Sequence, residues 1–321
     1  MTLLGRPLGG VDAGKTHTLL ADLPFHPDDW DRALSIPDHC ALAVRRLAAA
    51  GPDQAWAALD GSRVLGVACL SALPWDTGFF GLPMGRLDLL RAADPGAVDV
   101  LLEAVRAAAE QAGLRHLHHV LDARDQGLVR AFEGQGWHHA WTSVRMVADT
   151  ARREAEAVPS RVRSVEVVES TTAHLPELTE VAARLPRYSW LQHEPGLPAD
   201  RRAAYRATRL RSCVEGDLAD VCLTLLHRGR PVGFNASALA RHGDGTLGST
   251  FTFERDTFVD PAAPRGASRL LAQHVVARLT PRARYLTGLV RLPAVAMFRL
   301  LESVGFASSG GVLHLTLDLP G

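Results

Sequence analysis

The chain has 321 residues, of which 47% are hydrophobic and 22% charged, and its formal net charge is zero. This composition is typical of a globular protein, and a neutral charge balance gives no sign of a nucleic-acid or membrane partner. The four cysteines have no C-x-x-C spacing, so neither a zinc site nor a disulfide framework is indicated. No apolar run approaches the roughly 18 residues of a membrane helix, and no signal pattern opens the chain. We therefore expect a cytoplasmic protein of two domains.

Near the start, Gly9–Thr16 matches the phosphate-binding pattern G-x-x-x-x-G-K-[ST]. That motif needs a buried strand before it and a long helix after it. Met1–Leu8 contains a glycine and a proline and makes a poor buried strand, and two prolines soon follow the match. We interpret the match as a chance one.

Hydrophobic periodicity and turn residues predict alternating strands and helices through the first half. The expected strands are Thr18–Leu23, Ala55–Leu59, Val64–Leu70, Gly85–Leu90, Leu114–Leu121 and Trp141–Val147. The expected helices are one that opens at Pro27, then Cys40–Ala50, Ala97–Ala112 and Gln126–Gln135. Ala148–Arg163 is charged and contains a proline, which is typical of a linker.

The second half repeats this order of elements. Its expected strands are Val165–Val168, Val221–His227, Pro231–Ala240, Thr246–Val259, Tyr285–Val290 and Val312–Leu317. Its expected helices are Leu175–Leu185, Ala199–Val214, Ser268–Leu279 and Ala294–Val304. Repetition at about 150 residues indicates two copies of one domain rather than a solenoid. We predict an α/β protein, with an α+β mixed sheet, whose domains span 1–150 and 163–321.

The end of the long strand Thr246–Val259 is the most informative stretch. Prolines end the strand, because proline cannot continue a ladder, and Arg265–Ser268 then lead into the helix Ser268–Leu279. A strand, a glycine-containing loop and a helix N-terminus form a potential anion site, since the first backbone N–H groups of a helix lack partners.

This strand–loop–helix resembles the core of the GNAT superfamily of N-acetyltransferases, whose loop holds the pyrophosphate of acetyl-CoA. Val259-Asp260-Pro261 matches the family's strand end, and Arg265 and Gly266 match the start of its loop. Ser268 and Leu270 stand where two small residues are expected, so this part departs from the pattern. The element order of both halves is also that of two tandem GNAT domains.

Two further motifs carry the resemblance. Both halves end their last helix in the family's glycine–aromatic pair, at Gly136-Trp137 and Gly305-Phe306. Pro74–Gly81 resembles the W-D-x-x-F-F-G motif of the dTDP-fucosamine acetyltransferase group. That group pairs a degenerate N-terminal lobe with a C-terminal lobe that binds acetyl-CoA, which implies the same division here.

The resemblance implies acetyl-CoA or another acyl-CoA as co-substrate, held by the C-terminal lobe. Backbone groups of Thr257, Phe258 and Val259 would pair with the pantetheine. The pyrophosphate would lie against Arg265, Gly266, Ala267, Ser268 and Arg269. The N-terminal lobe has no such loop, and Asp94, expected as an N-cap or turn residue, would repel a pyrophosphate.

Amide formation from a thioester needs a base and an acid. Strand alternation puts Glu254 and Asp256 on one face, where the family often keeps its base; a half-buried salt bridge with Arg255 or a neighbour is the alternative reading. The family's tyrosine acid is replaced by Leu301, and by Phe132 in the first half. Neither side chain can donate a proton.

The loop Pro186–Pro198 is long enough to be functional, and in this fold it borders the acceptor site. Tyr188, His193 and Glu194 are candidate replacement acids or bases, although a surface loop explains them as well. Asn235 and Ser237 either face the cleft or are polar groups satisfied within the sheet. The sequence predicts no metal site at the cluster of histidines, because a site needs three or four converging ligands; these histidines are His116, His118, His119, His138 and His139.

We therefore expect an acyltransferase that moves an acetyl or other acyl group to an amine of a small molecule, such as an amino sugar or an amino-acid-like metabolite. The expected partner is that amine, with no membrane, and the chain would be a monomer or a homodimer. One alternative is a GNAT-fold enzyme with another donor or reaction: a charged tRNA, a carrier-protein thioester, a decarboxylation or a hydrolysis. The other is a non-catalytic binding protein.

Overall fold

The computed structural model describes residues 3–8, 13–23, 36–50, 53–152, 161–162, 164–185, 191, 193–216, 218–241 and 247–320. The chain divides into two compact units. Unit 1 comprises Met1–Thr142, Glu194–Pro198 and Gly310–Gly321, and unit 2 comprises Ser143–His193 and Ala199–Ser309. The predicted domains 1–150 and 163–321 differ from these units in two ways: residues 143–150 lie in unit 2, and Glu194–Pro198 and Gly310–Gly321 lie in unit 1. None of the helices described combines the length and apolar composition that crossing a membrane requires.

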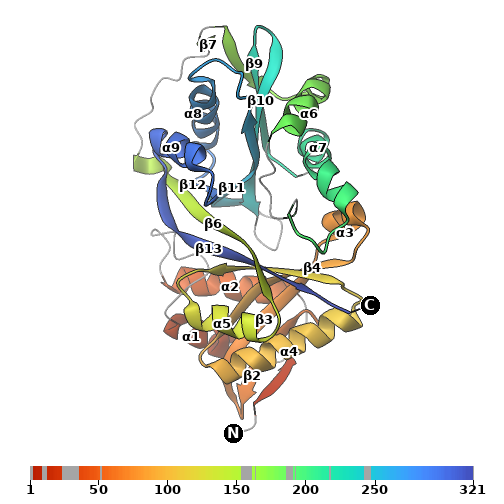
Figure 1. The fold of residues 1–321 in the computed structure, drawn as a ribbon. Coiled ribbons are helices and arrows are strands. Elements are labelled where there is room, and N and C mark those ends of the chain that lie inside the picture. The colour runs from red at the N-terminus through yellow and green to blue at the C-terminus, as the bar shows by residue number, and fades with distance from the viewer. Residues whose placement is uncertain are drawn as a thin grey trace. The chain divides into compact units, whose positions relative to one another are not determined.

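Unit 1 is a mixed sheet with helices on both faces (Figure 1). Its strands follow the order β1-β2-β3-β4-β5-β13, and the pairing of β4 with β5 is parallel. The elements are β1 (Leu4–Pro7), α1 (Ala13–Asp22), α2 (Ile36–Ala50), β2 (Ala55–Asp60), β3 (Arg63–Ala72), α3 (Pro74–Phe80), β4 (Met84–Ala92), α4 (Pro95–Gln111), β5 (His116–Asp122), α5 (Gln126–Gly134), the start of β6 (His138–Asp149) and most of β13 (Ala307–Asp318).

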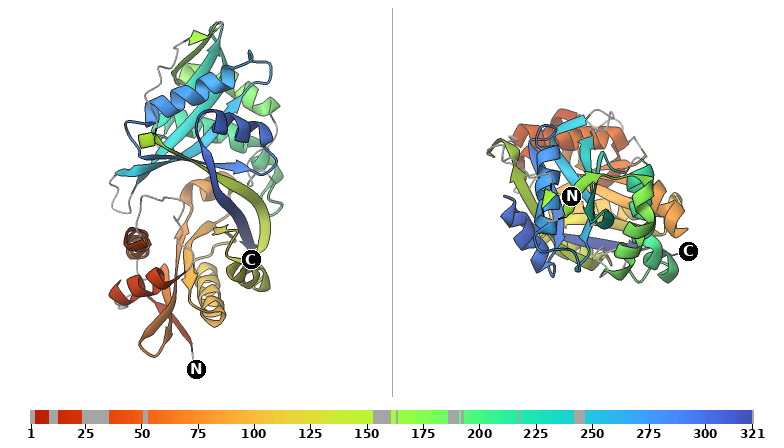
Figure 2. Two further views of the ribbon diagram at one scale, coloured as in Figure 1. Left: turned by 90° about the vertical axis from the view of Figure 1, so that its left-hand side faces the viewer. Right: turned by 90° about the horizontal axis from the view of Figure 1, so that it is seen from above.

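Side-chain alternation along β2 builds two cores in unit 1. Ala55 and Ala57 pack in the core that α1 and α2 cover, whereas Trp56 and Ala58 pack in the core beneath α4 and α5. The two helical layers lie on opposite sides of the strands in the left view of Figure 2. α4 buries a stripe at helical spacing, and each such side chain stabilises the fold by about 1.5–3 kcal/mol; the stripe comprises Val98, Leu101, Leu102 and Val105.

The prediction of a strand at Thr18–Leu23 is wrong, because these residues belong mainly to α1. Leu19 and Leu20 are buried together with Thr16, which is a helical spacing rather than an alternation, and they pack against α2. The hydroxyl of Thr18 donates to the Gly14 carbonyl, one helical turn back (3.0 Å). The adjacent phosphate-loop match lies partly outside the described residues, and the strand before it, β1, is exposed along its length. A phosphate loop needs a buried strand there.

Unit 2 repeats the same arrangement. Its strands follow the order β6-β12-β11-β10-β9-β8-β7, and β11 pairs with β12 in parallel. The elements are the rest of β6, two 3-10 turns (Thr150–Arg152 and Thr172–His174), β7 (Arg161–Val162), β8 (Val165–Glu169), α6 (Leu175–Arg184), α7 (Ala199–Glu215), β9 (Val221–His227), β10 (Arg230–Arg241), β11 (Leu247–Val259), α8 (Ala267–Leu279), β12 (Tyr285–Arg291), α9 (Val295–Ser303) and the start of β13.

The helices of unit 2 also cover both faces of its sheet (Figure 1). α8 packs on one face over Val221, Leu223 and Leu286, and α6 and α7 pack on the other face over Phe234 and Phe258. The helices and strands predicted from Cys40 onward are present with shifts of a few residues at their ends. The helix predicted at Pro27 lies outside the described residues, and so does 153–160 of the predicted linker.

Candidate functional site

The two central strands of unit 2 separate part of the way along their length. Among the residues that the structure describes, β11 and β12 pair at Phe251–Phe253 and Tyr285–Thr287 and nowhere else. β11 then continues beside β10 as far as Val259, and β12 continues beside β6 as far as Arg291. One backbone edge of 254–259 is therefore outside the ladder. An open strand edge offers alternating N–H and C=O groups to an extended ligand.

The loop after β11 is held in place by Asp260. Its carboxylate accepts hydrogen bonds from the Ala262 N–H (2.8 Å) and from the Arg184 guanidinium (2.7 Å), and these contacts lower the pKa of Asp260. Its carbonyl accepts from the Ala263 N–H. Gly266 caps α8 with φ of 93°, a left-handed backbone that favours glycine.

The N-terminus of α8 is open to an anion. Gly266 and the flanking Arg265 and Arg269 are exposed. The backbone N–H groups of Ser268 and Arg269 have no hydrogen-bond partner among the residues that the structure describes. Unpaired amides, the helix dipole and two cationic side chains together favour binding of a phosphate group.

Leu270, one of the two departures from the family's loop pattern, does not obstruct this helix end. Its side chain is 3% exposed and packs in the core with Ala267 and Leu271. It therefore occupies the core side of α8 rather than the loop. Ser268, the other departure, is half-buried.

A β-bulge separates the two candidate bases. Asp256 pairs with Ala236, but the next residue of β10, Ser237, pairs with Glu254. Arg255 is therefore the extra residue of the bulge and has no partner in the register with β10. A slip of one residue breaks the alternation of faces. The alternation that grouped Glu254 with Asp256 therefore does not hold across this point. The side chain of Glu254 lies outside the described residues.

Asp256 forms an ion pair with Arg206 of α7. Both carboxylate oxygens lie 3.4 Å from guanidinium nitrogens, and both side chains are largely buried. The guanidinium carbon also lies 5.2 Å from the centre of the Phe258 ring. A half-buried salt bridge with Arg255 or a neighbour is the alternative interpretation that the sequence offers for this carboxylate, and the sequence does not single out Arg206. The signal available was the row of arginines at helical spacing within Ala199–Val214.

Breaking this ion pair is expected to destabilise unit 2. Asp256→Leu alone would leave the Arg206 charge largely buried without its carboxylate, at a cost of about 2 kcal/mol, a partly exposed pair costing less than a fully buried one. Arg206→Met alone should cost a similar amount. The double variant should recover most of the loss, which urea unfolding of all three proteins measures. Additive losses would contradict a direct pair.

The polar residues of β10 are satisfied within the sheet. The Asn235 amide donates to the Thr257 hydroxyl (2.6 Å), and the Ser237 hydroxyl donates to the Asn235 carbonyl oxygen (3.1 Å). Asn235 and Ser237 are both buried. The structure therefore favours the interpretation that these two residues are polar groups satisfied within the sheet, and not residues that face a cleft.

The three candidate acids or bases of the loop 186–198 have different surroundings. Tyr188 lies outside the described residues, and His193 is exposed. Glu194 is 2% exposed and belongs to unit 1. Its carboxylate accepts hydrogen bonds from the Thr316 hydroxyl (3.1 Å) and the Gly196 N–H (3.3 Å). Burial and these two hydrogen bonds are typical of a carboxylate that anchors a loop. The catalytic role stays a prediction.

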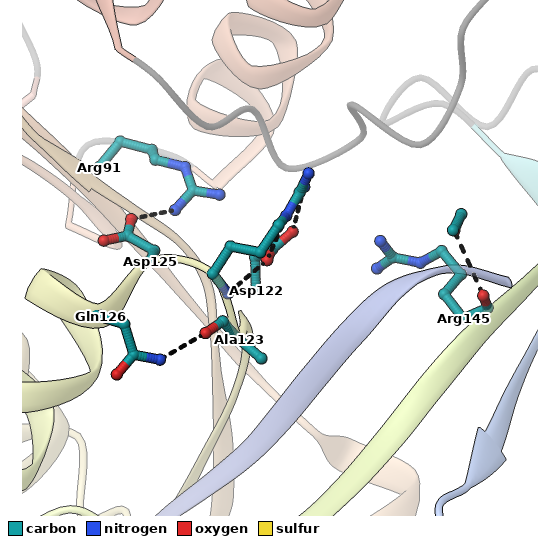
Figure 3. Close-up of polar contacts among 8 residues, drawn as sticks. Arg91, Asp122, Ala123, Asp125, Gln126 and Arg145 are labelled. Carbon is teal, nitrogen blue, oxygen red and sulfur yellow. Dashed lines mark hydrogen bonds and ion pairs between the residues drawn. The ribbon is translucent and has the colours of Figure 1, made fainter.

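In unit 1, the N-terminus of the corresponding helix, α4, is capped by a side chain. Asp94 caps α4, and its carboxylate accepts from the Ala97 N–H (3.0 Å), as the sequence predicts. α5 is closed in the same way by Asp125, whose other oxygen lies 3.8 Å from a nitrogen of Arg91 (Figure 3). A carboxylate at each helix end excludes a phosphate there.

The buried histidines of unit 1 include His118, His119 and His314. The rings of His118 and His314 stack (5.6 Å), and their Nε2 and Nδ1 atoms lie 3.4 Å apart. His119 Nδ1 lies 2.7 Å from the Leu87 carbonyl. Among the described residues no group of three potential ligands converges. Burial lowers the pKa of His119 and of His314 to about 4 and that of His118 well below its usual range.

The positions of the family's tyrosine are apolar in both units. Phe132 is fully buried and stacks on His119 (4.9 Å). Leu301 is half-buried on α9. Neither side chain offers a proton to a leaving group, as expected.

A scan against models of protein families and a search of curated proteins give no match. Solved structures do match. The chain is similar to a tandem GNAT protein from the clavulanic acid biosynthesis pathway over 100% of both chains (TM-score 0.56, 18% identity). It is similar to a GCN5-related N-acetyltransferase from Sphaerobacter thermophilus over 99% of this chain and 96% of that one (TM-score 0.61, 12% identity).

A third similarity is to the GCN5-related glucosamine N-acetyltransferase region of a fungal multi-domain GH3 β-N-acetylglucosaminidase (TM-score 0.58, 13% identity, 98% of this chain and 38% of that one). At these identities the likeness shows the fold. The chain has the mixed α/β fold of tandem GNAT proteins, which confirms the predicted fold class.

Proposed function

We propose that this protein transfers an acetyl or other acyl group from an acyl-CoA to an amine of a small molecule. The observation that carries the proposal is the pairing of two features in unit 2. Among the described residues, no strand pairs with one edge of β11 at 254–259, and the N-terminus of α8, which has no side-chain cap, follows within ten residues. A pantetheine amide chain and a diphosphate are the ligand groups that these two features suit.

The residues would divide the binding as follows. The open edge at Thr257, Phe258 and Val259 would pair with the pantetheine. The N–H groups of Ser268 and Arg269 would hold the pyrophosphate, and the exposed guanidiniums of Arg265 and Arg269 would add charge-assisted contacts. Unit 2 alone would hold the donor, because Asp94 closes the matching helix of unit 1.

The bound thioester supplies the activated acyl group, and the chain must supply a base for the ammonium proton. We assign that base to Glu254 and assign Asp256, whose carboxylate also contacts Arg206, to binding the acceptor. The amine nitrogen then bonds to the acyl carbon, the C–S bond breaks, and the thiolate takes a proton. With Leu301 in the tyrosine's position, Tyr188 is the acid that we nominate.

The fold alone leaves the acceptor open. The resemblance of Pro74–Gly81 to the dTDP-fucosamine acetyltransferase group favours an amino sugar within the wider class of small-molecule amines. In the structure this stretch includes α3, where Trp75 stacks on Phe79 with ring centres 5.5 Å apart.

The test is thiol release from acetyl-CoA, measured with and without a panel of small amines. We expect release that depends on the amine and rises with its concentration until it saturates. Glu254→Gln should lower kcat, whereas Asp256→Asn should act mainly on KM. Release at the same rate without any amine would instead support a hydrolase, and no release with any amine would contradict the proposal.

A further inference from the structure

α7 presents a row of long polar side chains on one side. Arg202, Tyr205, Arg206 and Arg209 are spaced by three and four residues, which places them on one helical face. We call these four residues the arginine face. The helix contains two more arginines, Arg201 and Arg211, which are exposed and lie near the carboxylates of Asp200 and Glu215.

The arginine face packs toward the sheet of unit 2 instead of extending into solvent. Arg206 reaches Asp256 on β11. Tyr205 is 5% exposed, and its hydroxyl accepts a hydrogen bond from the Arg209 guanidinium (3.0 Å). Arg202 and Arg209 are half-buried. Removing arginines from water is costly unless anionic groups contact them.

Arg202 lacks such a contact within the described part of the chain. Its Nε atom is buried and has no hydrogen-bond partner there. Buried donors in native structures are nearly always paired, so an unpaired one needs an explanation. An acceptor atom of a bound ligand provides it, because a guanidinium fork matches the two oxygens of a carboxylate or a phosphate.

Asp256 has capacity for a second donor. Its two contacts with Arg206 are 3.4 Å long, beyond the 2.7–3.2 Å of a typical N–H···O bond. A carboxylate offers about four acceptor positions. Asp256 also lies on the part of β11 that has left β12, next to the edge assigned to the donor.

We propose that the arginine face binds an anionic group, a carboxylate or a phosphate, on the amine that accepts the acyl group, with Asp256 contacting its ammonium. This inference rests on the proposed function and narrows its substrate class to amines that also carry a negative charge. A neutral amine would leave the Arg202 donor unsatisfied, and sites that lose a buried partner discriminate strongly.

The experiment compares amines that differ in the anionic group alone. The pairs are glycine with glycinamide, O-phosphoethanolamine with ethanolamine, and glucosamine 6-phosphate with glucosamine. With acetyl-CoA saturating, we expect kcat/KM to be at least about ten-fold higher for the anionic member of one or more pairs. The first pair reports on a carboxylate, and the other two report on a phosphate.

Variants of α7 then locate the effect. Arg202→Gln should remove the preference by raising KM with little change in kcat, and Arg202→Lys should restore part of it. Arg211→Gln makes the same charge change at the exposed side of the helix and should keep the preference. Equal kcat/KM within every pair, or an equal effect of Arg202→Gln and Arg211→Gln, would overturn the inference.

A binding measurement separates this inference from the proposed function. If acetyl-CoA is not used at all, the proposed function fails, and the same amines and inorganic phosphate are titrated by thermal shift without CoA. Stabilisation of the wild type and of Arg211→Gln, but not of Arg202→Gln, would support the anion site by itself. Absence of stabilisation by every anionic probe would overturn it.

Discussion

Gly266→Val is expected to raise the Kd for CoA at least about 100-fold, which corresponds to about 2.7 kcal/mol. A Cβ atom at Gly266 would meet nothing within 4 Å, so the new side chain would project into the open space at the start of α8. That is where the diphosphate would lie. Isothermal titration calorimetry with CoA measures the loss.

Gly229→Val is the matched control. Gly229 has φ of 80° against 93° at Gly266, and a Cβ there also meets nothing within 4 Å. It lies in the turn between β9 and β10 of the same unit. Both variants should therefore lose a similar 1–2 kcal/mol or so of stability from the left-handed backbone, while only Gly266→Val should lose CoA. Equal CoA affinity in the two variants would contradict the assignment.

Acidification from pH 6.5 to pH 4 is expected to destabilise unit 1 by on the order of 3 kcal/mol for each of two buried histidines, His119 and His314. The pKa of His119 and of His314 is about 4 in the folded chain, against 6.5 for an ordinary histidine, and burial is the main cause. The unfolded chain therefore binds more protons within this window. The contribution of these neutral histidines to the stability of unit 1 is present above pH 6.5 and is lost as the pH falls toward 4.

The measurement is the urea midpoint followed by tryptophan fluorescence across this range, because all the tryptophans except Trp190 belong to unit 1. His314→Gln removes one titrating group and should flatten the pH dependence. His227→Gln changes a histidine of unit 2 and should leave this signal from unit 1 unchanged. A midpoint independent of pH between 6.5 and 4 would show that these rings are not held neutral.

Local patterns in the sequence predicted most of the fold because they depend on neighbours along the chain. The stripe from Val98 to Val105 predicts α4 by its spacing, and Asp94 predicts its own cap. The strand predicted at Thr18–Leu23 is wrong because six residues are too few to distinguish a helical spacing from the alternation of a strand. The longer helix to which most of them belong, α1, depends on packing against α2.

Features that depend on distant pairing were not predictable in this way. The bulge at Arg255 follows from the register between β11 and β10. The ion pair of Asp256 with Arg206 joins residues 50 positions apart. The C-terminal residues of β13 pair with β5 in unit 1, about 200 positions earlier in the chain. Their place in the chain order alone assigns them to the C-terminal domain.

The central claim is that the N-terminus of α8 holds the diphosphate of a CoA thioester, and the stoichiometry of CoA binding to the full chain tests it most directly. Calorimetric titration should give one site per chain, because the first N–H groups of α8 have no partner among the described residues, whereas Asp94 occupies the matching position before α4. A second site of similar affinity, or no heat of binding at any CoA concentration, would contradict the account.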